Sequence, residues 1–251
     1  MQRLKHAILA LGIAILPLSG AQSVYAQLPS GADFESPEYA LGALNHADWT
    51  LHGDGSALVQ SSEVYEGSAA LELTSGTTVS YDVDSTEDVV WVNGWQKASS
   101  TGELPDLTQF TSGSALMVFR DDAIMCLDGD GAGSGTWTSV MSSPSNDWIQ
   151  VSLRLDYTAL TYECYLNGAL VGSDLGFLYN STSMLNGFTA HAGNASSFLD
   201  DIEFSTVVAT LTKSDIINHL MGVVFLSGAE YRSADINQDD ARDVADVLLA
   251  P

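Results

Sequence analysis

The chain has 251 residues, of which 32 are acidic and 8 are basic, and its formal net charge is −24. A surface with this charge repels nucleic acid and anionic lipid, so binding to either is not expected. The content of 45% hydrophobic residues and 22 glycines supplies one sizeable core and many turns.

The first 26 residues have the three-part pattern of a secretory signal. Arg3 and Lys5 form the basic start, residues 7–18 are apolar, and Val24-Tyr25-Ala26 fits the small-x-small cleavage pattern. The apolar run is too short for a comfortable membrane span. We expect residues 1–26 to be removed, the mature chain to have no membrane span, and the protein to be extracellular or on the cell surface.

Residues 27–207 are expected to form one all-β domain. The clearest strand is 148–157, where apolar and polar residues alternate. It is followed by the strand 160–166 and by Asn167-Gly168, a dipeptide typical of a type I′ hairpin turn. Further strands are expected around Trp137 and at 69–73, 77–83, 89–96, 115–120, 123–127, 187–192 and 197–204. About ten short strands without helical periodicity predict an antiparallel sandwich of two sheets.

Cys126 and Cys164 each fall in an expected strand. An oxidising compartment permits a disulfide between them, and two buried free thiols are the alternative. Neither has a C-x-x-C partner, so a thiolate metal site is not expected.

Tryptophan rings are candidates for sugar binding, because the C–H faces of sugars stack on them. Trp95 and Trp137 lie beside polar and glycine-rich segments, so we expect these two rings to be exposed and to bind a ligand. Sandwich cores also use tryptophan, which is the alternative for every ring.

No catalytic motif is found. The sequence contains no Glu-x-Asp-x-x-Glu strand, no Gly-x-Ser-x-Gly turn and no His-Glu-x-x-His helix. The histidines His46, His52, His191 and His219 are isolated in the sequence. The pattern favours a binding protein over an enzyme.

Residues 208–251 are expected to form a small helical module with one calcium loop. Residues 213–221 have apolar side chains at helical spacing. Residues 235–246 place oxygen donors at loop positions 1, 3, 5, 9 and 12 and a backbone carbonyl at position 7, which are the spacings that calcium needs. The expected ligands are Asp235, Asn237, Asp239, Ala241 (through its carbonyl), Asp243 and Asp246.

This loop resembles the type I dockerin repeat, in which an aspartate closes the loop and starts a helix. The resemblance implies calcium as the cofactor and a cohesin-like or cell-surface protein as partner. Dockerins of cellulosomes have two such loops, and this sequence has one.

The β domain resembles the concanavalin A-like or laminin-G-like jelly rolls. The features that carry the resemblance are Asp33-Phe-Glu-Ser36, the strand beginning at Trp148 with Tyr165-Leu-Asn-Gly168, and the closing segment 198–204. The family pairs its first and last strands, and some members hold a structural calcium, for which Glu35 and Asp201 are the candidates here. The resemblance implies a secreted module that binds a polysaccharide or another surface. A divergent polysaccharide-degrading enzyme and a structural, protein-binding domain are the alternatives.

Overall fold

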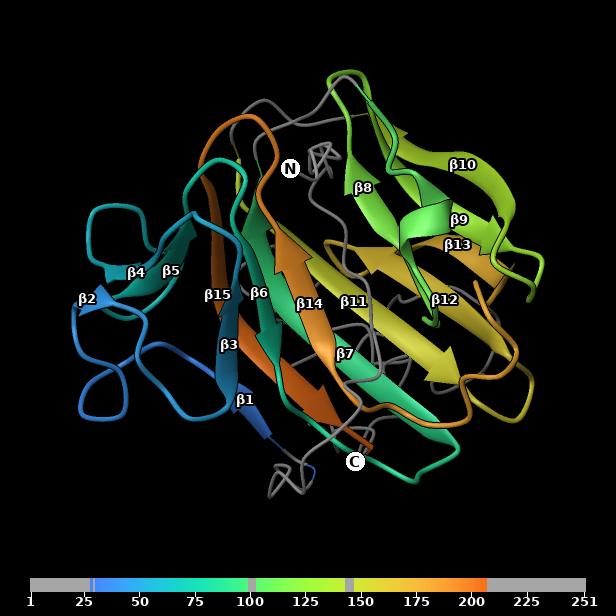
Figure 1. The fold of residues 1–251 in the computed structure, drawn as a ribbon, viewed down its shortest axis with the longest axis horizontal. Helices are drawn as coiled ribbons and strands as arrows, with labels where there is room; N and C mark the ends of the chain where they lie inside the picture. The colour runs from blue at the N-terminus through green and yellow to red at the C-terminus, as the bar shows by residue number, and fades with distance from the viewer. Residues whose placement is uncertain (1–27, 29, 99–102, 143–146, 207–251) are drawn as a thin grey trace, which may run out of the picture.

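The computed structural model describes residues 28, 30–98, 103–142 and 147–206, and these residues form an antiparallel β-sandwich of the jelly-roll type (Figure 1). Its one short helix is the 3-10 turn Leu107–Gln109, capped by the Asp106 side chain. None of the described helices is long and apolar enough to cross a membrane. The strands are β1 (Ser30–Ala32), β2 (Gly42–Ala43), β3 (Trp49–His52), β4 (Ala57–Gln60), β5 (Ala70–Leu73), β6 (Thr78–Tyr81), β7 (Val89–Lys97), β8 (Met117–Phe119), β9 (Ala123–Gly129), β10 (Gly135–Ser142), β11 (Ile149–Asp156), β12 (Thr161–Leu166), β13 (Ala169–Gly176), β14 (Phe188–His191) and β15 (Ser197–Ser205).

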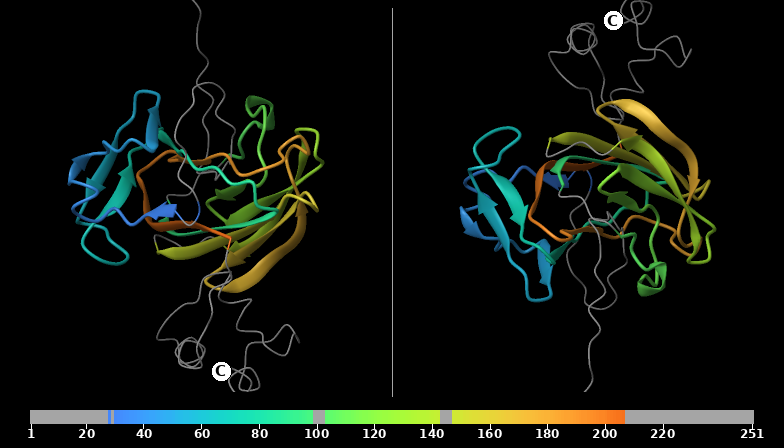
Figure 2. Two further views of the ribbon diagram at one scale, coloured as in Figure 1. Left: turned by 90° about the horizontal axis from the view of Figure 1, so that it is seen from below. Right: turned by 90° about the horizontal axis from the view of Figure 1, so that it is seen from above.

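The strands form two layers. One layer is a nine-stranded sheet in the order β13-β12-β11-β7-β15-β5-β4-β2, with β1 paired to β15. The other layer consists of two three-stranded sheets, β14-β6-β3 and β10-β9-β8. Figure 1 shows β3, β6 and β14 in front of the larger sheet, and Figure 2 shows the two layers from the side.

The core lies between these layers and follows from the alternation in the strands. In β11, Ile149, Val151, Leu153 and Leu155 are buried in the main core, as the period of two predicts. The central strand β7 contributes Val90 and Val92 to the same core. The side chains between them point to the other surface of the nine-stranded sheet, which we call the outer face.

The predicted hairpin is confirmed. Asn167 and Gly168 have φ values of 50° and 77°, and they connect β12 to β13 with Leu166 opposite Ala169. The expected pairing of the first and last strands is also confirmed, because Ser30 of β1 lies opposite Phe204 of β15.

The two cysteines come from different layers of the sandwich, Cys126 from β9 and Cys164 from β12. Both side chains are fully buried, and both thiols are free. The thiol of Cys126 forms a hydrogen bond with that of Cys164, which together with burial raises the pKa of Cys164 well above its usual value. The fold therefore brings together two residues whose pairing the sequence left open.

Two predicted parts of the chain lie outside the described residues. These are the signal segment 1–26 and the module 208–251 with its calcium loop at 235–246. Both stay predictions.

Candidate functional site

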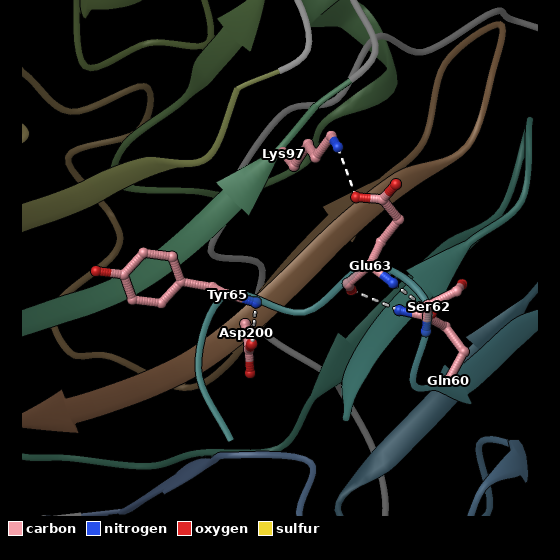
Figure 3. Close-up of polar contacts among 6 residues, drawn as sticks. All are labelled: Gln60, Ser62, Glu63, Tyr65, Lys97 and Asp200. Atoms are coloured by element: carbon pink, nitrogen blue, oxygen red, sulfur yellow. Dashed lines mark hydrogen bonds and ion pairs between the residues drawn. The ribbon is translucent and has the colours of Figure 1, made fainter. Parts of the chain in front are cut away.

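The candidate site is built on the outer face by the loop that joins β4 to β5. The loop starts at Gln60, whose Oε1 accepts hydrogen bonds from the backbone N–H of Ser62 (2.6 Å) and of Glu63 (3.0 Å). The Gln60 Nε2 donates to the Glu63 carbonyl at 2.7 Å. These contacts close the first turn of the loop on itself (Figure 3).

Two side chains of the sheet hold this loop in place (Figure 3). Lys97, at the end of β7, forms an ion pair with Glu63 at 2.6 Å. Asp200 of β15 accepts hydrogen bonds at Oδ2 from the backbone N–H groups of Tyr65 (3.0 Å) and Glu66 (3.3 Å). The loop is thereby attached to two neighbouring strands of the sheet.

Asp200 is a buried acid. Its side chain is 0% exposed, and its Oδ1 accepts a third hydrogen bond, from the backbone N–H of Asp201. Burial raises the pKa of Asp200 to about 7, although the backbone donors of Tyr65 and Glu66 act in the opposite direction. Desolvation is the largest effect on this pKa. It raises the pKa because burial disfavours the charged form of a carboxyl.

The loop delivers Tyr65 to a cluster of aromatic rings. The Tyr65 ring stacks on Trp95 of β7, with centroids 3.5 Å apart and planes at 15°. Trp148 meets Tyr65 edge-on at 6.1 Å, and Phe198 lies 6.5 Å from Trp148. We call these four residues the aromatic platform. Tyr65 is 36% exposed, so the platform presents an aromatic surface to solvent with Trp148 at its side.

The exposure that we expected for Trp95 is wrong. Trp95 is only 9% exposed, because the Tyr65 ring stacks on it and covers it. Trp137 is partly buried and packs on the cluster of Phe110, Leu116, Leu127 and Leu178, and so it lies apart from the platform. The sequence signal for Tyr65 was an aromatic residue in a polar, glycine-containing turn, and our sequence analysis missed it.

Glu35 and Asp201 stay candidates for a calcium ion. Burial raises the pKa of Asp201, and the nearby charges of Glu66, Asp33 and Glu35 add to this effect. The Glu35 carboxylate, however, already accepts hydrogen bonds from the backbone N–H groups of Ser68 and Ala69. Among the described residues, no group of three or more His, Cys, Asp or Glu side chains is arranged to hold a metal.

A second polar cluster lies on the surface of the β14-β6-β3 sheet. His52 Nε2 is 2.9 Å from Ser80 Oγ, which is 3.1 Å from Thr189 Oγ1, and Thr78 Oγ1 is 2.7 Å from His191 Nδ1. Ser80 is 5% exposed. Side chains on adjacent strands commonly form such cross-strand pairs, so the cluster does not by itself indicate catalysis.

No protein-family model matches the chain, and no curated protein sequence is significantly similar to it. Among solved structures, the cellulose-induced protein Cip1 is similar at a TM-score of 0.48 and 14% identity, over 71% of this chain and 97% of that one. An endo-β-1,4-glucuronan lyase from the fungus Trichoderma reesei has a TM-score of 0.46 and 13% identity, over 67% and 94% of the two chains.

A sialidase has a TM-score of 0.47 and 11% identity over 71% of this chain, which spans only 19% of the sialidase. At this level of similarity the three structures do not indicate an activity.

Proposed function

We propose that this chain is an exported glycan-binding module and that the aromatic platform is its binding site. The observation that carries the proposal is the stack of Tyr65 on Trp95, which leaves Tyr65 36% exposed beside Trp148. Aromatic rings with one open surface and a polar edge suit the apolar C–H faces of a sugar ring.

The platform is organised before any ligand arrives. The Asp200 hydrogen bonds, the Lys97–Glu63 ion pair and the Trp95 stack fix the position of Tyr65. Binding therefore loses little conformational entropy in the loop, and less of the interaction energy is spent on ordering it.

The charges around the platform favour a neutral glycan. Glu63 and Glu66 lie in the loop itself, and the whole chain has a net charge of −24. Polysaccharides rich in uronate or sulfate would be repelled by this field. The site therefore suits uncharged hexose or pentose chains.

Replacing Tyr65 by alanine is expected to weaken binding of a neutral polysaccharide by about tenfold or more, which is the usual effect of removing a central aromatic contact. A glycan array with uncharged and anionic chains identifies the ligand, and calorimetry measures its affinity for the purified variant.

Two controls make this test specific. Tyr65→Phe keeps the ring and the stack and is expected to retain most of the affinity. Leu170→Ala removes a hydrophobic side chain that is 45% exposed on β13 and should leave binding unchanged. Equal affinities for the wild type and Tyr65→Ala would reject the platform, and shortening of the polysaccharide during incubation would favour the enzyme alternative.

We also propose that the loop at residues 235–246 binds calcium and that the C-terminal module attaches the protein to a cohesin-like or cell-surface partner. The support is the spacing of the oxygen donors in the sequence.

Calcium titration of the mature chain in a calorimeter is expected to give a binding heat that is absent from the double variant Asp235→Ala, Asp246→Ala. Glu35→Gln is the matched variant, because it removes a carboxylate from the other expected calcium site, at Glu35 and Asp201. It should leave the binding heat of residues 235–246 unchanged. If the double variant binds calcium as the wild type does, residues 235–246 are not the site.

A further inference from the structure

The loop that joins β4 to β5 has a further attachment, at the end where it enters β5. Glu35 Oε1 accepts hydrogen bonds from the backbone N–H groups of Ser68 (2.6 Å) and Ala69 (3.0 Å). Glu35 Oε2 accepts a third hydrogen bond, from the Ser68 hydroxyl, at 2.5 Å. One carboxylate therefore binds three donors from two consecutive residues of the loop.

The backbone of the loop is shaped to receive this carboxylate. Gly67 has a φ of 70°, a left-handed conformation that glycine adopts more easily than other residues. A Cβ atom on Gly67 would lie too close to Glu35 Oε1. Successive backbone N–H groups in such a turn form a concave site for an anion, and here the Glu35 carboxylate occupies it.

Tyr65 lies in a segment that is attached to two acids. Asp200 accepts the N–H groups of residues 65 and 66, and Glu35 accepts those of residues 68 and 69. Every N–H from 65 to 69, except that of Gly67, thus donates to one of these two carboxylates. Residues 65–68 are exposed, so hydrogen bonds rather than buried side chains fix this part of the loop.

Glu35 is itself held in place, so it can act as a fixed anchor. The preceding residue, Phe34, is fully buried in the main core. Its ring centroid lies 5.2 Å from that of Tyr39 and 5.8 Å from that of Trp49. The Glu35 carbonyl accepts a hydrogen bond from the backbone N–H of Tyr39 at 2.9 Å.

We propose that Glu35 is a positioning residue of the aromatic platform, because its carboxylate holds the loop in the conformation in which Tyr65 stacks on Trp95. The consequence for glycan binding rests on the proposed function, whereas the effect on the stack does not. Without Glu35, three donors lose a charged acceptor, and the loop spends more time away from Trp95. The apparent affinity for a glycan then falls with the fraction of molecules in which the stack is formed.

The test uses the full mature chain with a chelator in every sample, which removes any ion bound at Glu35. Glu35→Ala is expected to increase acrylamide quenching of the Trp95 fluorescence about twofold, since opening of the loop uncovers the ring. The contribution of Trp95 is the part of the signal that Trp95→Phe removes.

Asp130→Ala is the matched control. The Asp130 carboxylate also accepts two backbone N–H groups, from Ala132 (2.8 Å) and Ser134 (3.0 Å), but it lies in the loop between β9 and β10, in the other layer. This variant should leave the quenching of Trp95 unchanged.

Two further variants separate positioning from other roles of Glu35. Glu35→Gln keeps an oxygen acceptor on a side chain of the same length, so the quenching of Trp95 is expected to stay close to that of the wild type. Gly67→Ala disturbs the same contact from the side of the loop, because its Cβ would displace Glu35 Oε1. It should increase the quenching as Glu35→Ala does, and it supplies the test if Glu35→Ala does not fold.

Calorimetry with cellohexaose and xylohexaose tests the consequence for binding. Glu35→Ala is expected to weaken the affinity for the bound oligosaccharide by about fivefold. Increased quenching with wild-type affinity would keep Glu35 as the anchor of the loop and reject the platform as the binding site. If the wild type binds neither oligosaccharide, the quenching alone decides the role of Glu35.

Wild-type quenching in both Glu35→Ala and Gly67→Ala would overturn the proposal. An effect of Glu35→Ala that appears only when calcium replaces the chelator would also overturn it, because a metal ligand and not a hydrogen-bond acceptor would then hold the loop.

Discussion

The free energy of unfolding is expected to fall as the pH rises from about 4 to about 7, because Asp200 is buried under the Tyr65 loop. The folded-state pKa of Asp200, about 7, lies above the usual pKa of an aspartate, 3.8. Between these values the folded protein binds more protons than the unfolded chain, and the free energy of unfolding then decreases with increasing pH. The contribution is fully present below pH 4 and is lost as the pH passes through 7.

The matched variant is Asp200→Asn, which keeps the size of the side chain and cannot ionise. The difference between the wild-type and variant free energies of unfolding is expected to change by at most about 4 kcal/mol between pH 4 and pH 8, with the wild type losing stability relative to the variant. Urea unfolding at a series of pH values measures this difference. A chelator in every sample removes any ion from the expected Glu35–Asp201 site.

Other acids titrate over the same range, and comparison with the variant removes their contributions. Asp82 and Asp201 also have raised pKa values, chiefly through burial. Glu35 has a lowered pKa because Ser68 and Ala69 donate hydrogen bonds to it, so its contribution is lost only at more acidic pH. Parallel pH profiles for the wild type and Asp200→Asn would show that folding does not raise the pKa of Asp200.

The second large effect is expected from the cysteine pair. Cys126 and Cys164 face each other from opposite layers of the sandwich, so loss of two protons and two electrons to an oxidant during export would join the layers. The resulting disulfide would restrict the unfolded chain between residues 126 and 164. This restriction is expected to raise the free energy of unfolding by about 4 kcal/mol.

Oxidised and reduced samples of the same protein measure this difference directly. Mass spectrometry of the exported, non-reduced chain should show the loss of two hydrogens, and reduction should lower the midpoint of urea unfolding. The double variant Cys126→Ala, Cys164→Ala is the control, since its midpoint should not respond to the reductant. Two free thiols in the exported protein, titrated after denaturation, would contradict the prediction.

Much of the β domain was predictable because its signals are local. The alternation in β11 separates Leu153 and Leu155 from Ser152 and Arg154 within one short segment, and Asn167-Gly168 marks its own turn. The Cys126 and Cys164 strands were also predicted. Their pairing was left open beside the alternative of two separate thiols, because it depends on how the two layers lie on each other.

The candidate site is where sequence reasoning failed. We expected the Trp95 ring of β7 to be exposed, and in the structure it is covered by Tyr65, which comes from the loop between β4 and β5. The backbone N–H of Tyr65 donates the hydrogen bond that positions this residue to Asp200, 135 residues away in the chain. Nothing in the sequence near either residue encodes that contact.

The sequence by itself determined the fold class, the inward and outward sides of the main strands and the hairpin turn, since side-chain periodicity and turn chemistry act between near neighbours. The tertiary structure alone decided which rings form the platform, which acid is buried and which thiols meet. Those features depend on strand order and register, which bring β4, β7, β11 and β15 together from distant parts of the chain.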